Sequence, residues 1–117
     1  MTSSMNYEIK LSTQFKHEAK RLKKRYHSLD TDLDALVVEL RQNPQAGTSL
    51  GNGVRKVRMA IASKGKGKSH GARVITATVL ISIENSDIIL LYIYDKAERD
   101  SISNQEIELL LRQNNLK

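Results

Sequence analysis

Three runs of β-forming residues between positions 54 and 94 limit the folds that this chain can adopt. Residues 54–61 alternate with a two-residue period, and residues 74–83 are rich in β-branched side chains. The polar sequence at 85–87 predicts a turn before the third run, residues 88–94. Because strands joined by short connections pair as antiparallel neighbours, we predict a three-stranded antiparallel meander.

A short strand and two helices are predicted before the meander. Residues 6–12 alternate between apolar and polar side chains, which is typical of a half-buried strand. Apolar residues then recur every three or four positions, which predicts one helix beginning near Ser12 or Thr13 and a second beginning within residues 28–31. The Asn-Pro pair at 43–44 should end the second helix. Two helices joined this closely should form an antiparallel hairpin.

The segments on either side of the meander complete the predicted order. Residues 45–53 contain three glycines and predict a loop. A last helix should begin within residues 100–103, and residues 113–117 should fray. We therefore expect one α+β domain spanning residues 1–117, in which an N-terminal strand and an α-hairpin pack on an antiparallel β-sheet with a C-terminal helix.

The charge of the chain is unevenly distributed. Its 117 residues carry a formal net charge of +6, and no Asp or Glu lies between Glu39 and Glu84. The cationic residues of this middle segment are Arg41, Arg55, Lys56, Arg58, Lys64, Lys66, Lys68 and Arg73. Such a continuous cationic stretch is typical of a nucleic-acid-binding protein, although a solvated basic surface has the same composition.

The composition also disfavours several classes of protein. The chain has no cysteine, which excludes disulfides and thiolate chemistry, and its three histidines show no metal-ligand spacing. We therefore expect no metal site and no cofactor. The apolar run 88–94 is too short to cross a bilayer, and residues 1–12 show no apolar export signal. These features predict a cytoplasmic protein without membrane contact.

The loop between the first two runs of the meander, residues 63–73, is the most distinctive motif of the chain. Its sequence SKGKGKSHGAR places lysines at alternate positions between glycines and ends with His70 and Arg73. Glycine lets a ligand approach the main chain, so ammonium and backbone N–H groups can bind one phosphate together. A nucleotide-binding phosphate loop is disfavoured, because Ala62 replaces its leading glycine and a strand should follow instead of a helix.

The cations around this loop suit phosphate chemistry without a metal. If Val57, Met59 and Ile61 point into the core, Lys56 and Arg58 share the opposite face of their strand. RNA cleavage requires deprotonation of a 2′-hydroxyl, stabilisation of a more highly charged transition state and protonation of the leaving 5′-oxygen. Clustered cations can contribute to each of these. The same residues also suit simple binding of the RNA backbone, and residue types alone do not separate the two.

The order of elements and three stretches of sequence resemble the RelE/ParE toxin superfamily, closest to its RelE and HigB-like members. The stretches are RKVRMA at 55–60, SKGKGKSHGARVI at 63–75 and LLYIYDKAERDSIS at 90–103. The resemblance implies a RelE-like fold and the toxin of a type II toxin–antitoxin system. Such a toxin is an endoribonuclease that cuts mRNA, usually in the ribosomal A site, and leaves a 2′,3′-cyclic phosphate without a metal. Its partners would be mRNA, the ribosome and a cognate antitoxin of the helix-turn-helix type.

The resemblance also assigns roles to residues. Lys56 and Arg58 match the basic pair of the family's central strand, and Arg73 matches the arginine that grips the scissile phosphate. Lys96, with Arg99 in reserve, matches a basic residue after the last strand. The predicted catalytic residues are Lys56, Arg58, Arg73, Lys96 and His70, and the candidates for the general base are Lys56, Lys68 and His70. The residues expected to bind RNA or the ribosome are Lys64, Lys66, Lys68, Arg55, Tyr94 and Arg99.

The sequence leaves alternatives open. His70 is alternatively a loop residue without a role, and Tyr94 is alternatively a core aromatic instead of a platform for a base. The whole chain is alternatively a ParE-like inhibitor of DNA gyrase or a non-catalytic RNA-binding module. We expect Arg73→Ala and Lys56→Ala to abolish toxicity and leave the fold intact, because neither side chain should contribute to the core.

Overall fold

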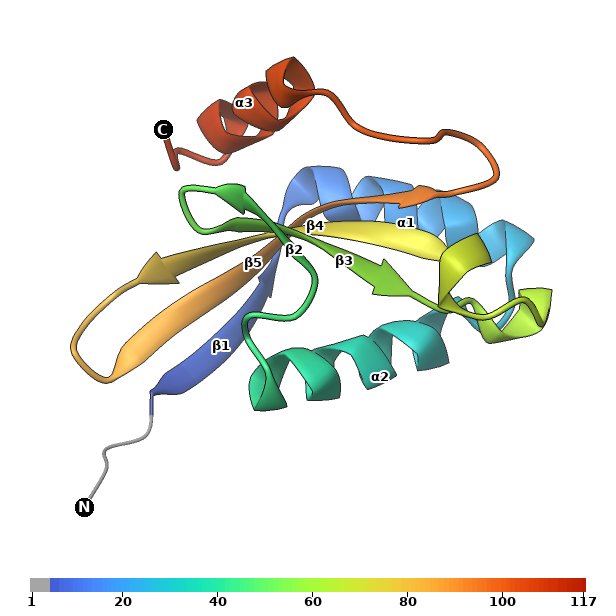
Figure 1. The fold of residues 1–117 in the computed structure, drawn as a ribbon, viewed down its shortest axis with the longest axis horizontal. Helices are drawn as coiled ribbons and strands as arrows, with labels where there is room; N and C mark the ends of the chain where they lie inside the picture. Colours follow the sequence, from blue (N-terminus) through green and yellow to red (C-terminus); the bar gives the residue numbers. More distant parts are fainter. Residues whose placement is uncertain (1–4) are drawn as a thin grey trace.

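The computed structural model describes residues 5–117 (Figure 1). Residues 1–4, part of the segment in which we expected no export signal, lie outside the described residues. In chain order the elements are β1 (Asn6–Leu11), α1 (Thr13–Arg25), α2 (Leu29–Gln42), β2 (Thr48–Gly51), β3 (Val54–Met59), the 3₁₀ turns η1 (Ala62–Lys64) and η2 (Lys68–His70), β4 (Ala72–Leu80), β5 (Asn85–Asp95) and α3 (Asn104–Gln113). This order confirms the predicted α+β class.

One sheet contains five strands in the order β1-β5-β4-β3-β2. β3, β4 and β5 pair as antiparallel neighbours, which confirms the predicted meander. β1 lies at one edge and pairs in parallel with β5, so the sheet is mostly, but not wholly, antiparallel. β3, β4 and β5 are therefore interior strands, and the loop of residues 63–73, called the basic loop below, follows β3 and leads into β4 at one end of the sheet.

The turn between β4 and β5 differs from the expectation. β4 ends at Leu80, and the chain turns over residues 81–84 instead of 85–87. The predicted strand extended to Ile83 because the residues before the turn are β-branched. Ile83 is instead 90% exposed at the tip of the hairpin, so its β-branched side chain is not buried against the sheet.

The predicted loop at 45–53 contains a further strand, β2, so that expectation is wrong. β2 pairs with β3 at the edge of the sheet and is exposed along its whole length. The connecting residues Asn52 and Gly53 have φ values of 54° and 78°. Positive φ at both positions is the backbone of the Asn-Gly turn that favours two-residue hairpins. The signal for β2 was therefore in the sequence, beside the glycines that suggested a loop.

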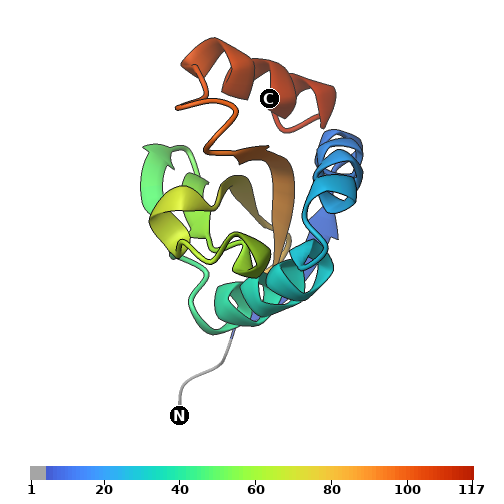
Figure 2. The same ribbon diagram turned by 90° about the vertical axis from the view of Figure 1, so that its right-hand side faces the viewer.

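Helices cover both faces of the sheet. α1 and α2 lie against one face and α3 lies against the other (Figure 2). α2 returns in roughly the opposite direction to α1 (Figure 1), as expected for a hairpin. The core on the α1/α2 face contains Phe15, Leu22, Leu36, Leu40, Val57, Met59, Val74, Leu90 and Ile93. The core on the α3 face contains Val54, Ile75, Ala77, Leu91, Tyr94, Ile107 and Leu111.

α3 is ordered at both ends. Ser103 caps its start through a capping box. After the helix, Asn115 adopts φ of 58°, and the Leu116 N–H donates to the Leu111 carbonyl at 2.8 Å. This left-handed cap satisfies carbonyls that a helix end otherwise leaves without partners. The expectation that residues 113–117 fray is therefore wrong.

Candidate functional site

Three strands place three side chains in one row on the α3 face of the sheet. Arg58 on β3 lies directly opposite Arg73 on β4, and Arg73 lies opposite Tyr94 on β5. Lys56 precedes Arg58 by two residues and therefore lies on the same face. The predicted sharing of one strand face by Lys56 and Arg58 is confirmed. We call Arg58, Arg73 and Tyr94 the arginine row.

Arg73 is the buried cation of this row, with 7% of its surface exposed. Its Nη1 donates to the carbonyls of Lys68 at 3.1 Å and Ala72 at 3.2 Å, and its Nη2 donates to the Ser69 carbonyl at 3.2 Å. Burial, and then the charge of Arg58, lower the pKa of Arg73. Within residues 5–117 it forms no ion pair, so the cation is held in place without being neutralised. The expectation that Arg73 contributes nothing to the folded core is wrong.

Tyr94 closes the arginine row on β5. It is 2% exposed, and in the described part of the chain its hydroxyl has no hydrogen-bond partner. Burial raises the pKa of Tyr94, and the charges of Arg73 and Arg99 oppose that rise. The Arg99 guanidinium lies 5.4 Å from the centre of the Tyr94 ring, held by hydrogen bonds of 2.7 and 2.8 Å to Glu106. Tyr94 is therefore a core aromatic, and its stacking on a base stays a prediction.

Lys56 and Arg58 extend the positive surface outward from Arg73. Arg58 is exposed and Lys56 is half-buried. Among the described residues neither side chain takes part in an ion pair or a hydrogen bond. Both cations are consequently available to a ligand that approaches the α3 face beside Arg73.

Lys64 anchors the basic loop from within. Its Nζ donates to Asp95 Oδ1 at 2.5 Å and to the His70 carbonyl at 2.9 Å. The side chains of Lys64 and Asp95 are 11% and 0% exposed. Lys64 therefore stabilises the loop instead of presenting its charge at the surface, and a role in binding RNA stays a prediction.

Asp95, the last residue of β5, gathers donors from three parts of the chain. The Tyr26 hydroxyl donates to its Oδ2 at 2.5 Å, and the Ala97 N–H donates to its Oδ1 at 3.0 Å, beside Lys64. Burial favours a raised pKa of Asp95, but the hydrogen bonds from Lys64, Tyr26 and Ala97 outweigh it and lower that pKa. Sequence reasoning missed Tyr26 and Asp95. The available signal was an aspartate directly after the apolar run 88–94.

Two other predicted binding residues have partners elsewhere. Arg55 donates to the carbonyls of Ala46 at 3.1 Å and Gly47 at 2.9 Å, and so holds the segment that leads into β2. Lys68 lies 3.7 Å from Glu39 in an exposed ion pair with α2. Such exposed pairs are weak and can be exchanged for a phosphate. Roles for Arg55 and Lys68 in binding RNA stay predictions.

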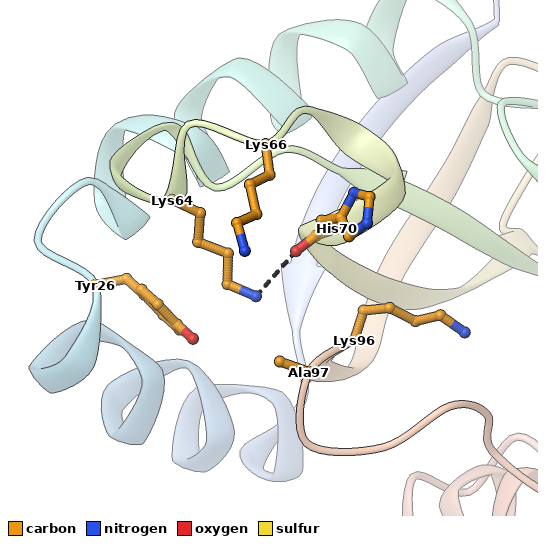
Figure 3. A pocket seen from close by; sticks show the side chains of 6 residues that line it. All are labelled: Tyr26, Lys64, Lys66, His70, Lys96 and Ala97. Atoms are coloured by element: carbon orange, nitrogen blue, oxygen red, sulfur yellow. Dashed lines mark hydrogen bonds between the residues drawn. The ribbon is translucent and has the colours of Figure 1, made fainter.

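A pocket of about 340 Å³ lies where the basic loop, the end of α1 and the segment after β5 meet (Figure 3). Its lining residues are Tyr26, Lys64, Lys66, His70, Lys96 and Ala97, and we call it the loop pocket. The side chains of Lys66 and Lys64 point into the same space (Figure 3). Lys96 is steadied by a 2.8 Å hydrogen bond from its Nζ to the Asp100 carbonyl. The pocket thus brings together residues that were predicted separately on the loop and after β5.

The arginine row and the loop pocket are joined through η2. The carbonyls of Lys68 and Ser69 accept hydrogen bonds from Arg73, and the next residue, His70, lines the pocket. The predicted site residues on the α3 face of the sheet are Lys56, Arg58, Arg73 and Tyr94, and Arg99, after β5, lies over the Tyr94 ring. Those in the pocket are Lys64, Lys66, His70 and Lys96.

Two further observations concern residues 5–117. None of their helices has the length and apolar composition needed to cross a membrane. No three of their His, Asp and Glu side chains gather in an arrangement that could hold a metal ion.

Comparison with known proteins assigns the family. A search of curated proteins gives no significant match. The family model described as the RelE toxin of the RelE/RelB toxin–antitoxin system matches residues 13–115. This range includes both the arginine row and the loop pocket, and the match confirms the resemblance seen in the sequence. The chain therefore belongs to the RelE toxin family and is the toxin of a toxin–antitoxin system, with a cognate antitoxin as its partner.

Proposed function

We propose that this RelE-family toxin is a metal-independent endoribonuclease that cleaves mRNA in the ribosomal A site. The observation that carries the proposal is the geometry of Arg73, which is buried and fixed by three backbone carbonyls. Within residues 5–117 no carboxylate neutralises it, and Arg58 directly opposite adds a second positive charge. A planar guanidinium held in this way suits the two oxygens of a phosphodiester.

The proposed reaction is an internal transfer at phosphorus. The 2′-oxygen of one nucleotide attacks the adjacent phosphorus, and the bond from phosphorus to the 5′-oxygen of the next nucleotide breaks. The products are a 2′,3′-cyclic phosphate and a free 5′-hydroxyl. Arg73 and Arg58 stabilise the additional negative charge of the phosphorane-like transition state. Because Arg73 is fixed before substrate binds, its stabilisation of charge needs little reorganisation.

Two proton transfers accompany this exchange of bonds. A base accepts the proton of the 2′-hydroxyl, and an acid donates a proton to the leaving 5′-oxygen. We assign Lys56 to proton transfer, since it lies on the same strand face as Arg58. Lys68 and His70 are the other candidates for the base. Lys96 is the candidate that approaches from the segment after β5.

The ribosomal setting is supported by the charge of the loop. The exposed side chains of Lys66 and Lys68 project from a protein of net charge +6. Lysines at such positions bind phosphates largely irrespective of sequence, as contact with ribosomal RNA requires. We therefore propose that Lys68 helps to hold the toxin on the ribosome while the arginine row acts on mRNA.

Primer extension on translated mRNA after induced expression tests this proposal. We expect cuts within coding sequence and upstream fragments that end in a cyclic phosphate. Arg58→Ala should reduce cleavage about 100-fold or more, as loss of one charge-stabilising donor does in other enzymes. Lys16→Ala, a change to an exposed α1 lysine, should cut as the parent does. Intact transcripts in growth-arrested cells would refute the nuclease, and a gyrase supercoiling assay would then test the ParE-like alternative.

A further inference from the structure

We propose that the loop pocket is a second phosphate subsite, which binds the nucleotide next to the one held by the arginine row. This inference rests on the proposed function, because it assumes that RNA lies across Arg73. It assigns a binding role to Tyr26, which was not predicted, and it moves His70 and Lys96 away from the reacting atoms. The ligand class is an RNA phosphodiester with its ribose.

The size and the charge of the loop pocket are the first evidence that it binds a phosphate. Its volume of about 340 Å³ is at the lower end of the range for ligand sites, which suits one sugar phosphate. Lys66, His70 and Lys96 line it, and the Lys66 ammonium group points into it (Figure 3). The Asp95 carboxylate beneath it is 0% exposed and accepts from Lys64, Tyr26 and Ala97. That carboxylate is therefore covered, and an entering phosphate does not meet its charge directly.

The Asp100 carboxylate lies close to Lys96. Asp100 Oδ1 is 3.7 Å from Lys96 Nζ, and the Asp100 side chain is 96% exposed. An ion pair this exposed contributes little and yields easily to a competing anion. Lys66 forms no ion pair within the described residues and points into the pocket (Figure 3). Lys66 is therefore the cation most available to a phosphate.

The walls of the pocket are built before any ligand binds. Tyr26 is tied to Asp95 by its hydroxyl, and Lys64 crosses from the loop to Asp95 and to the His70 carbonyl. These contacts fix the end of α1, the basic loop and the end of β5 relative to one another. A site preorganised in this way binds without the cost of ordering its own side chains. The Tyr26 ring and the Ala97 methyl supply an apolar wall for the ribose.

The position of the pocket relative to Arg73 identifies the ligand as part of the same RNA. η2 presents the Lys68 and Ser69 carbonyls to Arg73, while His70, at its end, lines the pocket. The backbone of η2 thus contacts both sites. A chain of RNA whose phosphate lies at Arg73 can place its next phosphate on the other side of η2.

Binding of an uncleavable RNA tests the inference separately from the nuclease reaction. The probe is a 2′-O-methyl trinucleotide, which lacks the attacking hydroxyl. Fluorescence anisotropy should show that Lys66→Ala weakens binding about tenfold. The slope of log affinity against log salt should fall by about 0.7, which corresponds to one lost phosphate contact on a single strand. Lys16→Ala removes an exposed lysine of α1 outside both sites and should bind as the parent does.

Amide chemical-shift mapping with the same probe locates the contact. We expect shifts at residues 65–71 and at Ala97 in the parent, and loss of these shifts in Lys66→Ala. If Lys66→Ala binds the trinucleotide as the parent does, the subsite is refuted even when the parent cleaves mRNA. If Lys66-dependent binding occurs without any cleavage, the subsite stands and the nuclease proposal fails. Inorganic phosphate is the second probe, and equal affinity for it and the trinucleotide would overturn the assignment to RNA.

Discussion

Arg58 and Arg73 face each other directly in the ladder between β3 and β4, so two positive charges are paired across adjacent strands. Like charges directly opposite one another destabilise a sheet. An anion bound between the two guanidinium groups would remove this repulsion. The repulsion between Arg58 and Arg73 therefore lowers the stability of the free protein. Binding of an anion at the arginine row would restore that stability.

Arg58→Ala should make the free protein more stable. The change removes the repulsion from an exposed position, and we expect the free energy of unfolding to rise by about 0.2–1 kcal/mol. RNA cleavage should fall at the same time, as is common when a functional site is relieved of strain. Urea denaturation measures the stability, and Arg58→Lys, which keeps the charge, should match the parent. A less stable Arg58→Ala protein would show that Arg58 supports the fold.

Arg73→Ala should have the opposite effect on stability. The guanidinium donates to the carbonyls of Lys68, Ser69 and Ala72, and hydrogen bonds to a charged group contribute about 1.5–3 kcal/mol. We expect the free energy of unfolding to fall by at least about 1.5 kcal/mol, even though the change also removes the repulsion from Arg58, and toxicity to be lost. Denaturation of Arg58→Ala provides the matched comparison, because it changes the same residue type at the exposed end of the row. Unchanged stability of Arg73→Ala would mean that the buried guanidinium serves only the ligand.

Lys64 and Lys66 should respond differently to the same substitution. Lys64 forms an ion pair with the fully buried Asp95, and breaking a buried pair from one side costs about 3–5 kcal/mol. Lys66 is exposed, and its replacement by alanine should change stability by no more than about 0.5 kcal/mol. Thermal or chemical unfolding of Lys64→Ala and Lys66→Ala compares two lysines that are two positions apart. Equal stabilities would show that the Lys64–Asp95 contact does not hold the loop.

The fold was largely predictable because its elements have strong periodicity. The alternation in residues 6–12 identified β1, but a two-residue period specifies a strand and not its partner, so the parallel pairing with β5 was not predictable. β2 was missed because glycines were given more weight than the hairpin turn at Asn52 and Gly53. The strand before the turn was predicted to be too long because Ile83 is β-branched yet exposed.

The site was predictable only where it depends on local alternation. The shared face of Lys56 and Arg58 follows from the two-residue period of one strand. The cluster of Lys64, Asp95 and Tyr26 does not, because these residues come from three distant segments and meet only in the folded chain. A lysine in a glycine-rich loop gives no local indication that its ammonium group is buried. Burial of such cations depends on tertiary packing, which the sequence pattern of one segment does not contain.

The ion pair between Arg99 and Glu106 should make stability depend on pH in the acidic range. Hydrogen bonds from Arg99, and then from the Ser103 backbone, lower the pKa of Glu106 from 4.5 to about 2. The pKa of Glu106 is lower in the folded state than in the unfolded state. The stabilisation by the ion pair is therefore fully present above pH 4.5 and is lost as the pH falls toward 2. Glu106→Gln, which can keep the capping box, should show a shallower loss of stability in this window. Urea denaturation at several pH values measures it, and Arg99→Ala should reproduce the shallower profile.

Gly71→Ala should disturb the arginine row and the loop pocket together. A Cβ at Gly71 would lie 2.1 Å from the Met59 carbonyl oxygen, so the backbone must move where β3 ends and β4 begins. Overpacking of this kind costs about 1–3 kcal/mol. The Gly71 N–H donates to the Lys68 carbonyl, and the Gly71 carbonyl accepts from the Lys96 N–H, so the displacement reaches both sites.

The matched control for Gly71→Ala is Gly65→Asn in the same loop. Gly65 has φ of 68° and open space where a Cβ would lie, and asparagine tolerates this backbone better than other residues. We expect Gly65→Asn to keep near-parental stability. Gly71→Ala should lose stability, and its binding of the 2′-O-methyl trinucleotide should weaken even at temperatures where circular dichroism shows it folded. If folded Gly71→Ala binds RNA as the parent does, the position of the η2 backbone does not matter for RNA recognition, and side chains alone make the contacts.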